Sequence, residues 1–213
     1  MEVWSLLIPL FVWYFHTKHE NEFQPIIIYI WITLVIYSII NIITYLYKPL
    51  HFPVWLQSNN WLYNLHSIVR LLLFSMFFIN LNQPFLVKLK KIIPILFILF
   101  VIINFSFFEY FFSFEFMSSR LLAVESGILL FYCLQFYFFI FLKEDNWSLK
   151  DTPSFWIVTG LSILIVISFP IYIFYVQLVL ENKNFGIDIW RVLNLAFLVF
   201  CIFTAIGFYK SRR

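Results

Sequence analysis

"WLYNLHSIVRLLLFSMFFI", residues 61–79, is the stretch that decides the fold class. Its length and apolar content match the roughly 20 residues that an α-helix needs to cross about 30 Å of hydrocarbon. Two residues interrupt it, His66 and Arg70, which are four positions apart and therefore share one helical face. An arginine near the centre of a bilayer costs about 2.5–3.5 kcal/mol on insertion scales. We therefore expect this face to point into a helix bundle, where Arg70 has a carboxylate partner.

The whole chain has the composition of a membrane protein. Of its 213 residues, 63% are hydrophobic and 12% are charged, and the mean hydropathy is +0.91. Soluble domains are nearer to about 45–50% apolar and 25% charged. Polar connections divide the chain into seven apolar segments, the first of them short: 2–16, 25–47, 59–81, 92–108, 118–142, 154–180 and 188–209. The sequence predicts an all-α polytopic membrane helix bundle that forms one domain over residues 1–213.

Lysine and arginine are divided unequally between the two sides of the predicted bundle. One side carries nine of them: Lys18, Lys88, Lys90, Lys91, Lys143, Lys150, Lys210, Arg212 and Arg213. The other side carries four: Lys48, Arg120, Lys183 and Arg191. Because cytoplasmic loops hold the excess of basic residues, we expect the N-terminus outside and the C-terminus inside a bacterial inner membrane. The net charge of +3 is spread over short connections, which suits membrane lipid as a partner and excludes a nucleic-acid footprint.

Three predicted spans bring polar side chains into the outward half of the bundle. They are Tyr63, His66, Ser67 and Arg70 in the third span, Glu125 and Ser126 in the fifth, and Asp188, Arg191 and Asn194 in the seventh. One interpretation is a pocket that holds a small anionic or zwitterionic ligand between the two arginines, with Glu125 as the counter-ion. The alternative is a pair of ion pairs, Arg70 with Glu125 and Asp188 with Arg191, that only fix the helix register.

Several kinds of chemistry are excluded by missing motifs. The spans have no interior lysine for a retinal Schiff base, and the chain has no G-x-S-x-G elbow, phosphate-binding loop or H-E-x-x-H pair. No cofactor, metal site or catalytic set is therefore predicted. His66 is either a proton sensor or a hydrogen-bonding partner of a neighbouring helix. The two cysteines, Cys133 and Cys201, are expected as small buried side chains rather than as a disulfide.

Proline and glycine usage predicts how the helices pack. Pro170, deep in the sixth span, is the best candidate for a hinge. The four glycines form no small-xxx-small run, so helix contacts are expected to use large side chains rather than close backbone crossings. Single amides at Asn41, Asn104 and Gln135 are expected in the inner half, each joining two helices.

Four stretches resemble one family. They are NNWLYNLHSIV (59–69), LLAVESGILLFY (121–132), DTPSFWIVTGLSI (151–163) and IWRVLNLAFLVF (189–200). From Asn59 onward, about two-thirds of the chain resembles uncharacterised seven-helix inner-membrane proteins of the Bacteroidetes that often occur beside two-component histidine kinases. The resemblance implies a seven-helix membrane protein with a sensory role and no assigned reaction. An acidic residue is usual in that family at the position of Arg70, where this sequence differs.

Three functions remain open on this evidence. The first is a sensory or signalling protein that binds a small molecule in the outer half, shifts the sixth or seventh helix and acts through a partner such as a histidine kinase. The second is an intramembrane enzyme on a lipid or isoprenoid, with Glu125 and His66 as acid and base. The third is a small transporter, which needs access from both sides. Contact between His66 and Glu125 would favour the enzyme, whereas a sealed Arg70–Glu125 pair would favour a structural role.

Overall fold

The computed structural model describes residues 3–16, 21–50, 58–142, 151–181 and 183–211. The described chain is built from seven α-helices: α1 (Leu7–His16), α2 (Gln24–Leu50), α3 (Asn60–Asn80), α4 (Val87–Ile103), α5 (Ser119–Leu142), α6 (Pro153–Glu181) and α7 (Lys183–Lys210). Short 3-10 turns at Val3–Leu6 and Asn21–Phe23 precede α1 and α2, and a π-helical turn at Asn104–Phe108 continues α4. The prediction of an all-α bundle is confirmed.

Six of the seven helices are long and apolar enough to cross a membrane, namely α2 to α7. The segment predicted at 2–16 forms an apolar helix over Val3–Phe15, which at 1.5 Å per residue is about 20 Å long. That length is less than the roughly 30 Å of a hydrocarbon core. The two largest boundary errors are equal: α4 begins at Val87 rather than at residue 92, and α7 begins at Lys183 rather than at residue 188. The start of α4 was missed because Lys88, Lys90 and Lys91 were assigned to the preceding connection.

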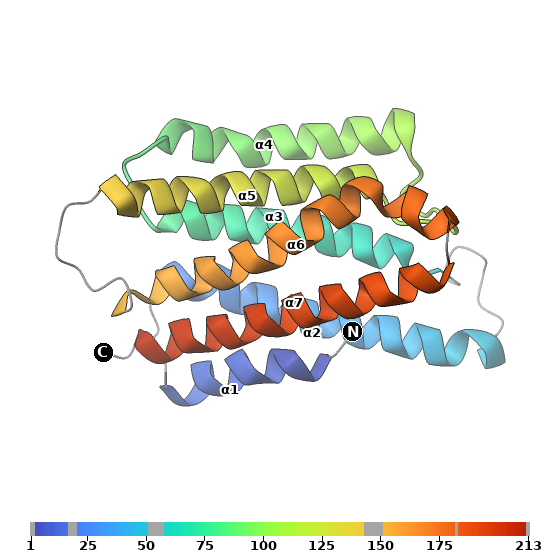
Figure 1. The fold of residues 1–213 in the computed structure, drawn as a ribbon, viewed down its shortest axis with the longest axis horizontal. Helices are drawn as coiled ribbons and strands as arrows, with labels where there is room; N and C mark the ends of the chain where they lie inside the picture. The colour runs from blue at the N-terminus through green and yellow to red at the C-terminus, as the bar shows by residue number, and fades with distance from the viewer. Residues whose placement is uncertain (1–2, 17–20, 51–57, 143–150, 182, 212–213) are drawn as a thin grey trace.

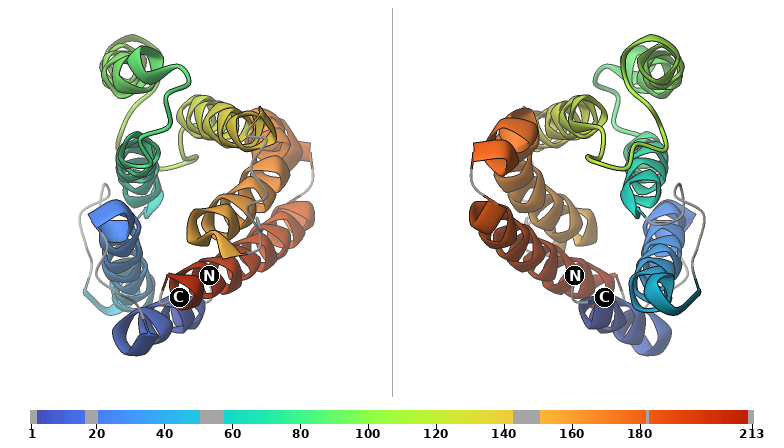
Figure 2. Two further views of the ribbon diagram at one scale, coloured as in Figure 1. Left: turned by 90° about the vertical axis from the view of Figure 1, so that its left-hand side faces the viewer. Right: turned by 90° about the vertical axis from the view of Figure 1, so that its right-hand side faces the viewer.

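The helices form a ring with one helix outside it. Contacts run from α2 to α3, α3 to α5, α5 to α6, α6 to α7 and α7 to α1, and α4 packs mainly against the outer side of α3 (Figure 2). The exposed side of α4 is a row of aliphatic side chains that includes Ile95, Leu96, Leu99 and Ile102. Such a face is suited to contact with lipid.

One end of the bundle, which we call the basic end, is where α3, α5 and α7 end and where α2, α4 and α6 begin (Figure 1). It carries Lys88, Lys90 and Lys91 at the start of α4 and Lys210 at the end of α7. Five further basic residues that were assigned to the same side, Lys18, Lys143, Lys150, Arg212 and Arg213, lie outside the described residues. At the opposite end α3 and α5 begin.

The interior of the ring is filled by aromatic side chains. Tyr29 of α2, Phe74 of α3 and Phe200 of α7 are fully buried with ring centroids 5.0–6.2 Å apart. Phe78 and Tyr132 stack between α3 and α5, with ring planes inclined by 7°. Cys133 and Cys201 are buried and unbridged, as predicted.

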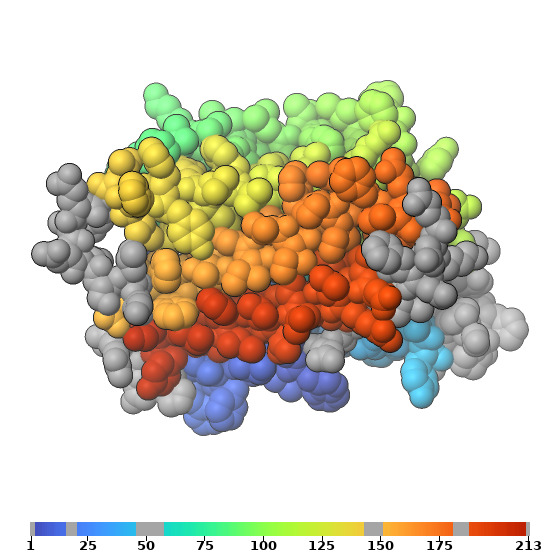
Figure 3. Space-filling view, in the orientation of Figure 1, coloured from blue at the N-terminus to red at the C-terminus, as the bar shows by residue number. Residues whose placement is uncertain are grey.

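Helices α6 and α7 approach each other more closely than the sequence suggested, and they lie side by side along their length (Figure 3). A Cβ atom added at Gly160 would lie 2.6 Å from Cβ of Phe203, and one added at Gly207 would lie 2.9 Å from the carbonyl oxygen of Pro153. Glycine is needed at both contacts because there is no room for a side chain. The expectation that large side chains alone make the helix contacts was wrong for this pair.

Helix α6 bends in its second half (Figure 1). Pro170 lies inside the helix, where it lacks a backbone N–H and its ring crowds the preceding turn, which is a common cause of kinks. The hydroxyl of buried Ser168 donates to the carbonyl of Ile165 at 3.4 Å, one turn before the proline. Tyr172, two residues after Pro170, points to the interior and is 8% exposed.

Candidate functional site

Arg70 and Glu125 form an ion pair between α3 and α5. The Arg70 Nε donates to Oε1 of Glu125, and Nη2 donates to Oε2 at 2.7 Å, so the guanidinium contacts both carboxylate oxygens. The arginine is 5% exposed and the glutamate is completely buried. Because α3 and α5 are direct neighbours in the ring, the predicted pairing is met without a third helix between them. A two-point contact of this kind fixes geometry as well as charge.

Two hydroxyl groups complete the surroundings of this pair. Ser67, one turn before Arg70, donates to Oε2 of Glu125 at 2.6 Å. Tyr172 lines the same small cavity as Arg70, which brings the part of α6 that follows Pro170 beside the pair. The carboxylate thus accepts three hydrogen bonds from α3. Such saturation offsets part of the cost of burying both charges.

His66 belongs to a different set of contacts from Glu125. Its Nε2 lies 3.1 Å from the hydroxyl of Thr33 on α2, and its ring packs between Tyr29 and Tyr37, with centroid distances of 5.7 and 5.2 Å. The recorded hydrogen bonds of the described residues join His66 to Thr33, not to Glu125. His66 therefore joins α3 to α2, while Arg70 joins α3 to α5.

A small cavity lies beside the ion pair. Its walls come from α2, α3, α5, α6 and α7 and from the connection before α5, and they include Tyr37, Tyr63, His66, Arg70, Tyr172 and Trp190. Its volume is about 20 Å³, which is enough for one water molecule. Three of the residues expected to form a polar pocket, Tyr63, His66 and Arg70, thus converge on this cavity. A metabolite fits only if these walls move apart.

The seventh helix contributes different residues from those expected. Arg191 pairs with Asp188 at 2.9 Å, and its side chain is 76% exposed, so the second arginine lies away from the cavity. Asn194 is half-buried and is not among the residues that line the cavity. Trp190 and Leu193 line it instead, three positions apart on the inner face of α7. This apolar face at helical spacing is the signal that could have placed α7 correctly.

Two of the residues predicted in this region have buried polar atoms without a recorded partner. Within the described part of the chain, no hydrogen bond is recorded for the hydroxyl of Ser126 or for Oδ1 of Asn194. Ser126 is completely buried next to Glu125. Tyr63, the remaining predicted residue, lines the cavity, and its ring lies 5.4 Å from that of Trp190.

A second polar cluster, not anticipated from the sequence, closes the opposite end of the bundle. Asn64 of α3 donates to the carbonyl of Phe111 and accepts from the amide of Ser118, both at 3.0 Å. Glu109 accepts hydrogen bonds from Ser118 and from Asn104, the latter at 3.0 Å. Asn104 was expected as a single amide in the inner half, but it lies at the end of α4 that adjoins the start of α5. The cluster fastens residues 109–118 to α3.

Comparison of the chain with protein-family models, with curated proteins and with solved structures finds no match. Interpretation of the site consequently rests on its own geometry.

Proposed function

We propose that this chain is a sensory protein of a bacterial inner membrane that binds a small zwitterionic ligand at the Arg70–Glu125 pair. The observation that carries the proposal is a buried charged pair that borders a closed cavity, one wall of which is formed by the kinked helix α6. The same proposal places the N-terminus outside and the basic end in the cytoplasm, in keeping with the distribution of lysine and arginine.

The charges themselves support a functional role. Ionisable residues within spans are costly, and they commonly mark ligand or ion sites. A hydrophobic pair of similar size would hold α3 against α5 at least as well, because replacing buried ion pairs by apolar residues is often neutral or stabilising. Stability alone is therefore a weak reason for placing Arg70 and Glu125 here.

The pairing also favours one class of ligand among those considered. A purely anionic molecule beside Arg70 would be repelled by Glu125. A zwitterion supplies one group for each partner, so it can separate the pair without leaving either charge unpaired in a medium of low dielectric. Of the two ligand classes considered, anionic and zwitterionic, we therefore propose the zwitterionic class, which includes amino acids and betaines.

The coupling to α6 provides a route for a signal. A ligand larger than water must displace side chains of the cavity wall, which include Tyr172 and Trp190. Tyr172 lies two residues after Pro170, and a kinked helix needs little energy to change its angle when the proline has already removed a backbone hydrogen bond. Movement of α6 would then be detected by a membrane partner, for which a histidine kinase is the candidate that the family resemblance suggests.

The two other hypotheses receive less support from the geometry. In the enzyme hypothesis Glu125 and His66 act together, yet Glu125 is hydrogen-bonded by Arg70 and Ser67, and His66 contacts Thr33. A transporter requires access from both sides, whereas the cavity holds about 20 Å³.

The test is a thermal unfolding screen of the purified protein in detergent against amino acids, betaines, simple anions and neutral metabolites. A zwitterion should raise the Tm of the wild type by several degrees and leave unchanged that of Leu193→Phe, whose larger side chain occupies the small cavity. Arg191→Ala, at the exposed pair on α7, is the matched control and should respond like the wild type. If no zwitterion raises the Tm, or if Leu193→Phe responds equally, the proposal fails and the pair is structural.

A further inference from the structure

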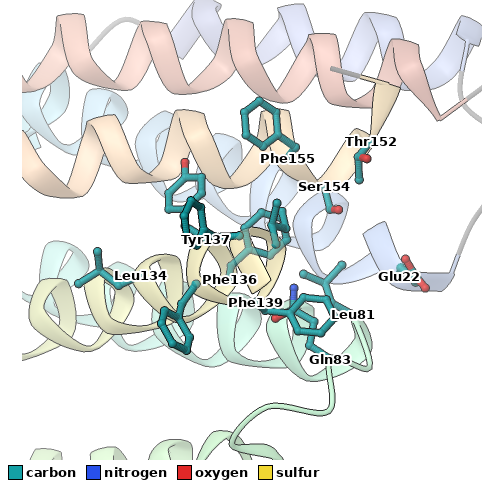
Figure 4. A pocket seen from close by; sticks show the side chains of 13 residues that line it. Glu22, Leu81, Gln83, Leu134, Phe136, Tyr137, Phe139, Thr152, Ser154 and Phe155 are labelled. Carbon is teal, nitrogen blue, oxygen red and sulfur yellow. The ribbon is translucent and has the colours of Figure 1, made fainter. Parts of the chain in front are cut away.

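A larger cavity, of about 860 Å³, opens at the basic end of the bundle (Figure 4). It lies between the connection that follows α3, the second half of α5, the first turn of α6 and the 3-10 turn before α2. It shares no lining residue with the small cavity beside Arg70. Its volume falls within the range of about 300–1,000 Å³ that is usual for small-molecule sites. The sensory role proposed above makes no use of it.

One part of this cavity is apolar and continuous with the lipid-facing surface of α5. Its walls are mostly aromatic, including Phe136, Tyr137 and Phe155. Leu134 and Phe141 line the same cavity, and they are 59% and 86% exposed on the outside of the bundle. A hydrocarbon chain could thus enter from the bilayer without crossing a polar barrier.

The other part of the cavity is polar, and it offers hydrogen-bond donors. Thr152 and Ser154, at the start of α6, lie at the end of the cavity away from Leu134 (Figure 4). Their hydroxyl groups can donate to an acceptor that enters the cavity. No hydrogen bond from either hydroxyl is recorded within the described part of the chain.

Gln83 adds a donor whose orientation is fixed by a lysine. Gln83 is 6% exposed, lines the cavity and accepts a hydrogen bond at 3.2 Å from Nζ of Lys90 through its Oε1. An ammonium group can only donate, so the amide oxygen must face Lys90 and the amide nitrogen must face elsewhere. Among the described residues no partner is recorded for that nitrogen. Since Gln83 lines the cavity, this nitrogen can donate to a molecule that enters it.

A cation lies behind the polar end of the cavity, where Lys90 holds Gln83 in place. The surrounding donors suit the phosphate oxygens, which are strong acceptors.

From this arrangement we infer that the cavity is a binding site for a phospholipid, which it recognises by the phosphate. An acyl chain lies along the aromatic wall formed by α5, and the phosphate accepts hydrogen bonds from Gln83, Thr152 and Ser154. The polar groups lie at the end of the bundle, between the connection that follows α3 and the start of α6. A free metabolite would make no use of the apolar part of the cavity, where Leu134 and Phe141 reach the outside of the bundle.

The first experiment compares four probes on delipidated protein in dodecyl maltoside, using thermal unfolding and native mass spectrometry. Dioctanoyl phosphatidylethanolamine should raise the Tm by several degrees and remain bound as one molecule per chain. Dioctanoyl phosphatidylglycerol, which has the same phosphate, should respond similarly, dioctanoylglycerol should bind at least several-fold more weakly, and inorganic phosphate should have no effect. Equal responses to phosphatidylethanolamine and dioctanoylglycerol would overturn the headgroup assignment, and a response to inorganic phosphate alone would overturn the lipid assignment.

Two variants locate the binding site. Ser154→Phe places a ring in the polar end and should abolish retention of the lipid, while Ile95→Phe, a similar enlargement on the exposed face of α4, should retain it. Gln83→Leu removes the amide donor and should weaken phosphatidylethanolamine binding about tenfold without changing the response to dioctanoylglycerol. Size-exclusion profiles and the Tm without lipid establish that each variant is folded. Unchanged lipid retention in folded Ser154→Phe would place the lipid outside the cavity and overturn the inference.

Discussion

Arg70 and Glu125 join α3 to α5: Nε and Nη2 of the guanidinium each donate to one carboxylate oxygen, and both side chains are almost completely shielded from solvent. Charges in such a medium interact strongly, and each is expensive to leave alone. Removing one partner should therefore destabilise the protein much more than replacing both partners with apolar residues.

Removing either partner should destabilise the protein strongly. Arg70→Ala or Glu125→Ala leaves one buried charge without compensation, and we expect each to lower the free energy of unfolding by about 3–5 kcal/mol. The double variant Arg70→Met with Glu125→Leu should lose less than either single variant, since no charge remains. Reversible unfolding in mixed micelles of dodecyl maltoside and SDS measures these differences.

An exposed ion pair is the control for this cycle. Arg191→Ala breaks the contact with Asp188, in which both side chains are more than half exposed, and such pairs contribute roughly 0–1 kcal/mol. If the two single changes at Arg70 and Glu125 proved additive in a double alanine variant, the two residues would not be energetically coupled, contrary to the geometry.

The two hydroxyls next to the site should differ in importance. Ser67 donates to a buried carboxylate at 2.6 Å, and hydrogen bonds to charged groups contribute about 1.5–3 kcal/mol. Thr33 bonds to His66 at 3.1 Å, a contact between uncharged groups that in membrane proteins averages about 0.6 kcal/mol. Unfolding of Ser67→Ala and Thr33→Val under the same conditions should show the larger loss at Ser67. Equal losses would mean that the charge of Glu125 does not strengthen its hydrogen bond with Ser67.

The Arg70–Glu125 pair is the part of the site that could be predicted from the sequence alone. The cost of burying Arg70 demands a carboxylate, and Glu125 was the carboxylate that the sequence placed well inside another span. The residue types and their positions along each predicted span are enough for this prediction, and both can be read from the sequence. Thirty phenylalanines and an apolar content of 63% similarly determine a helical bundle in lipid.

The features that were missed depend on how helices are rotated about their axes. Arg191 is close to Trp190 in sequence, but a rotation of about 100° per residue separates their directions. Which of the two faces the ring is decided by the packing of α7 against α6 and α1. The same holds for the two glycines between α6 and α7. Gly160 of α6 packs against α7, and Gly207 of α7 packs against α6, but neither belongs to a motif within its own helix.

Asn64 should control the attachment of residues 109–118. Its amide makes two hydrogen bonds to that segment, at Phe111 and Ser118, and Asn64→Ala removes both. Amide hydrogen exchange over residues 109–118 should become at least several-fold faster in the variant, because that segment loses contacts that hold it on α3. Asn41→Ala, at an exposed amide on α2, is the control and should leave the exchange of this segment unchanged. Equal protection in both variants would show that the other hydrogen bonds of the segment, including those from Asn60 to the carbonyls of Ser113 and Phe114, suffice to hold it.

The glycine contacts between α6 and α7 yield the most discriminating test of the helix packing. Gly207→Ala places its methyl 2.6 Å from Cγ1 of Ile157 and 2.9 Å from the carbonyl of Pro153, which is backbone and cannot move without shifting α6. Gly160→Ala meets Phe203 at 2.6 Å and the backbone of Phe200 at 3.3 Å. Overpacking of this kind costs about 1–3 kcal/mol, and we expect both variants to unfold earlier by that amount in mixed micelles.

Gly127 on α5 provides the matched comparison for these substitutions. A methyl there would lie 3.5 Å from the ring of Phe169, an ordinary van der Waals distance, and alanine is the better helix former by about 1 kcal/mol. Gly127→Ala should therefore be neutral or stabilising, while the same change at Gly160 or Gly207 is not. If all three variants behaved alike, helix propensity would outweigh packing, and α6 and α7 would have to lie further apart than the contacts at Gly160 and Gly207 indicate.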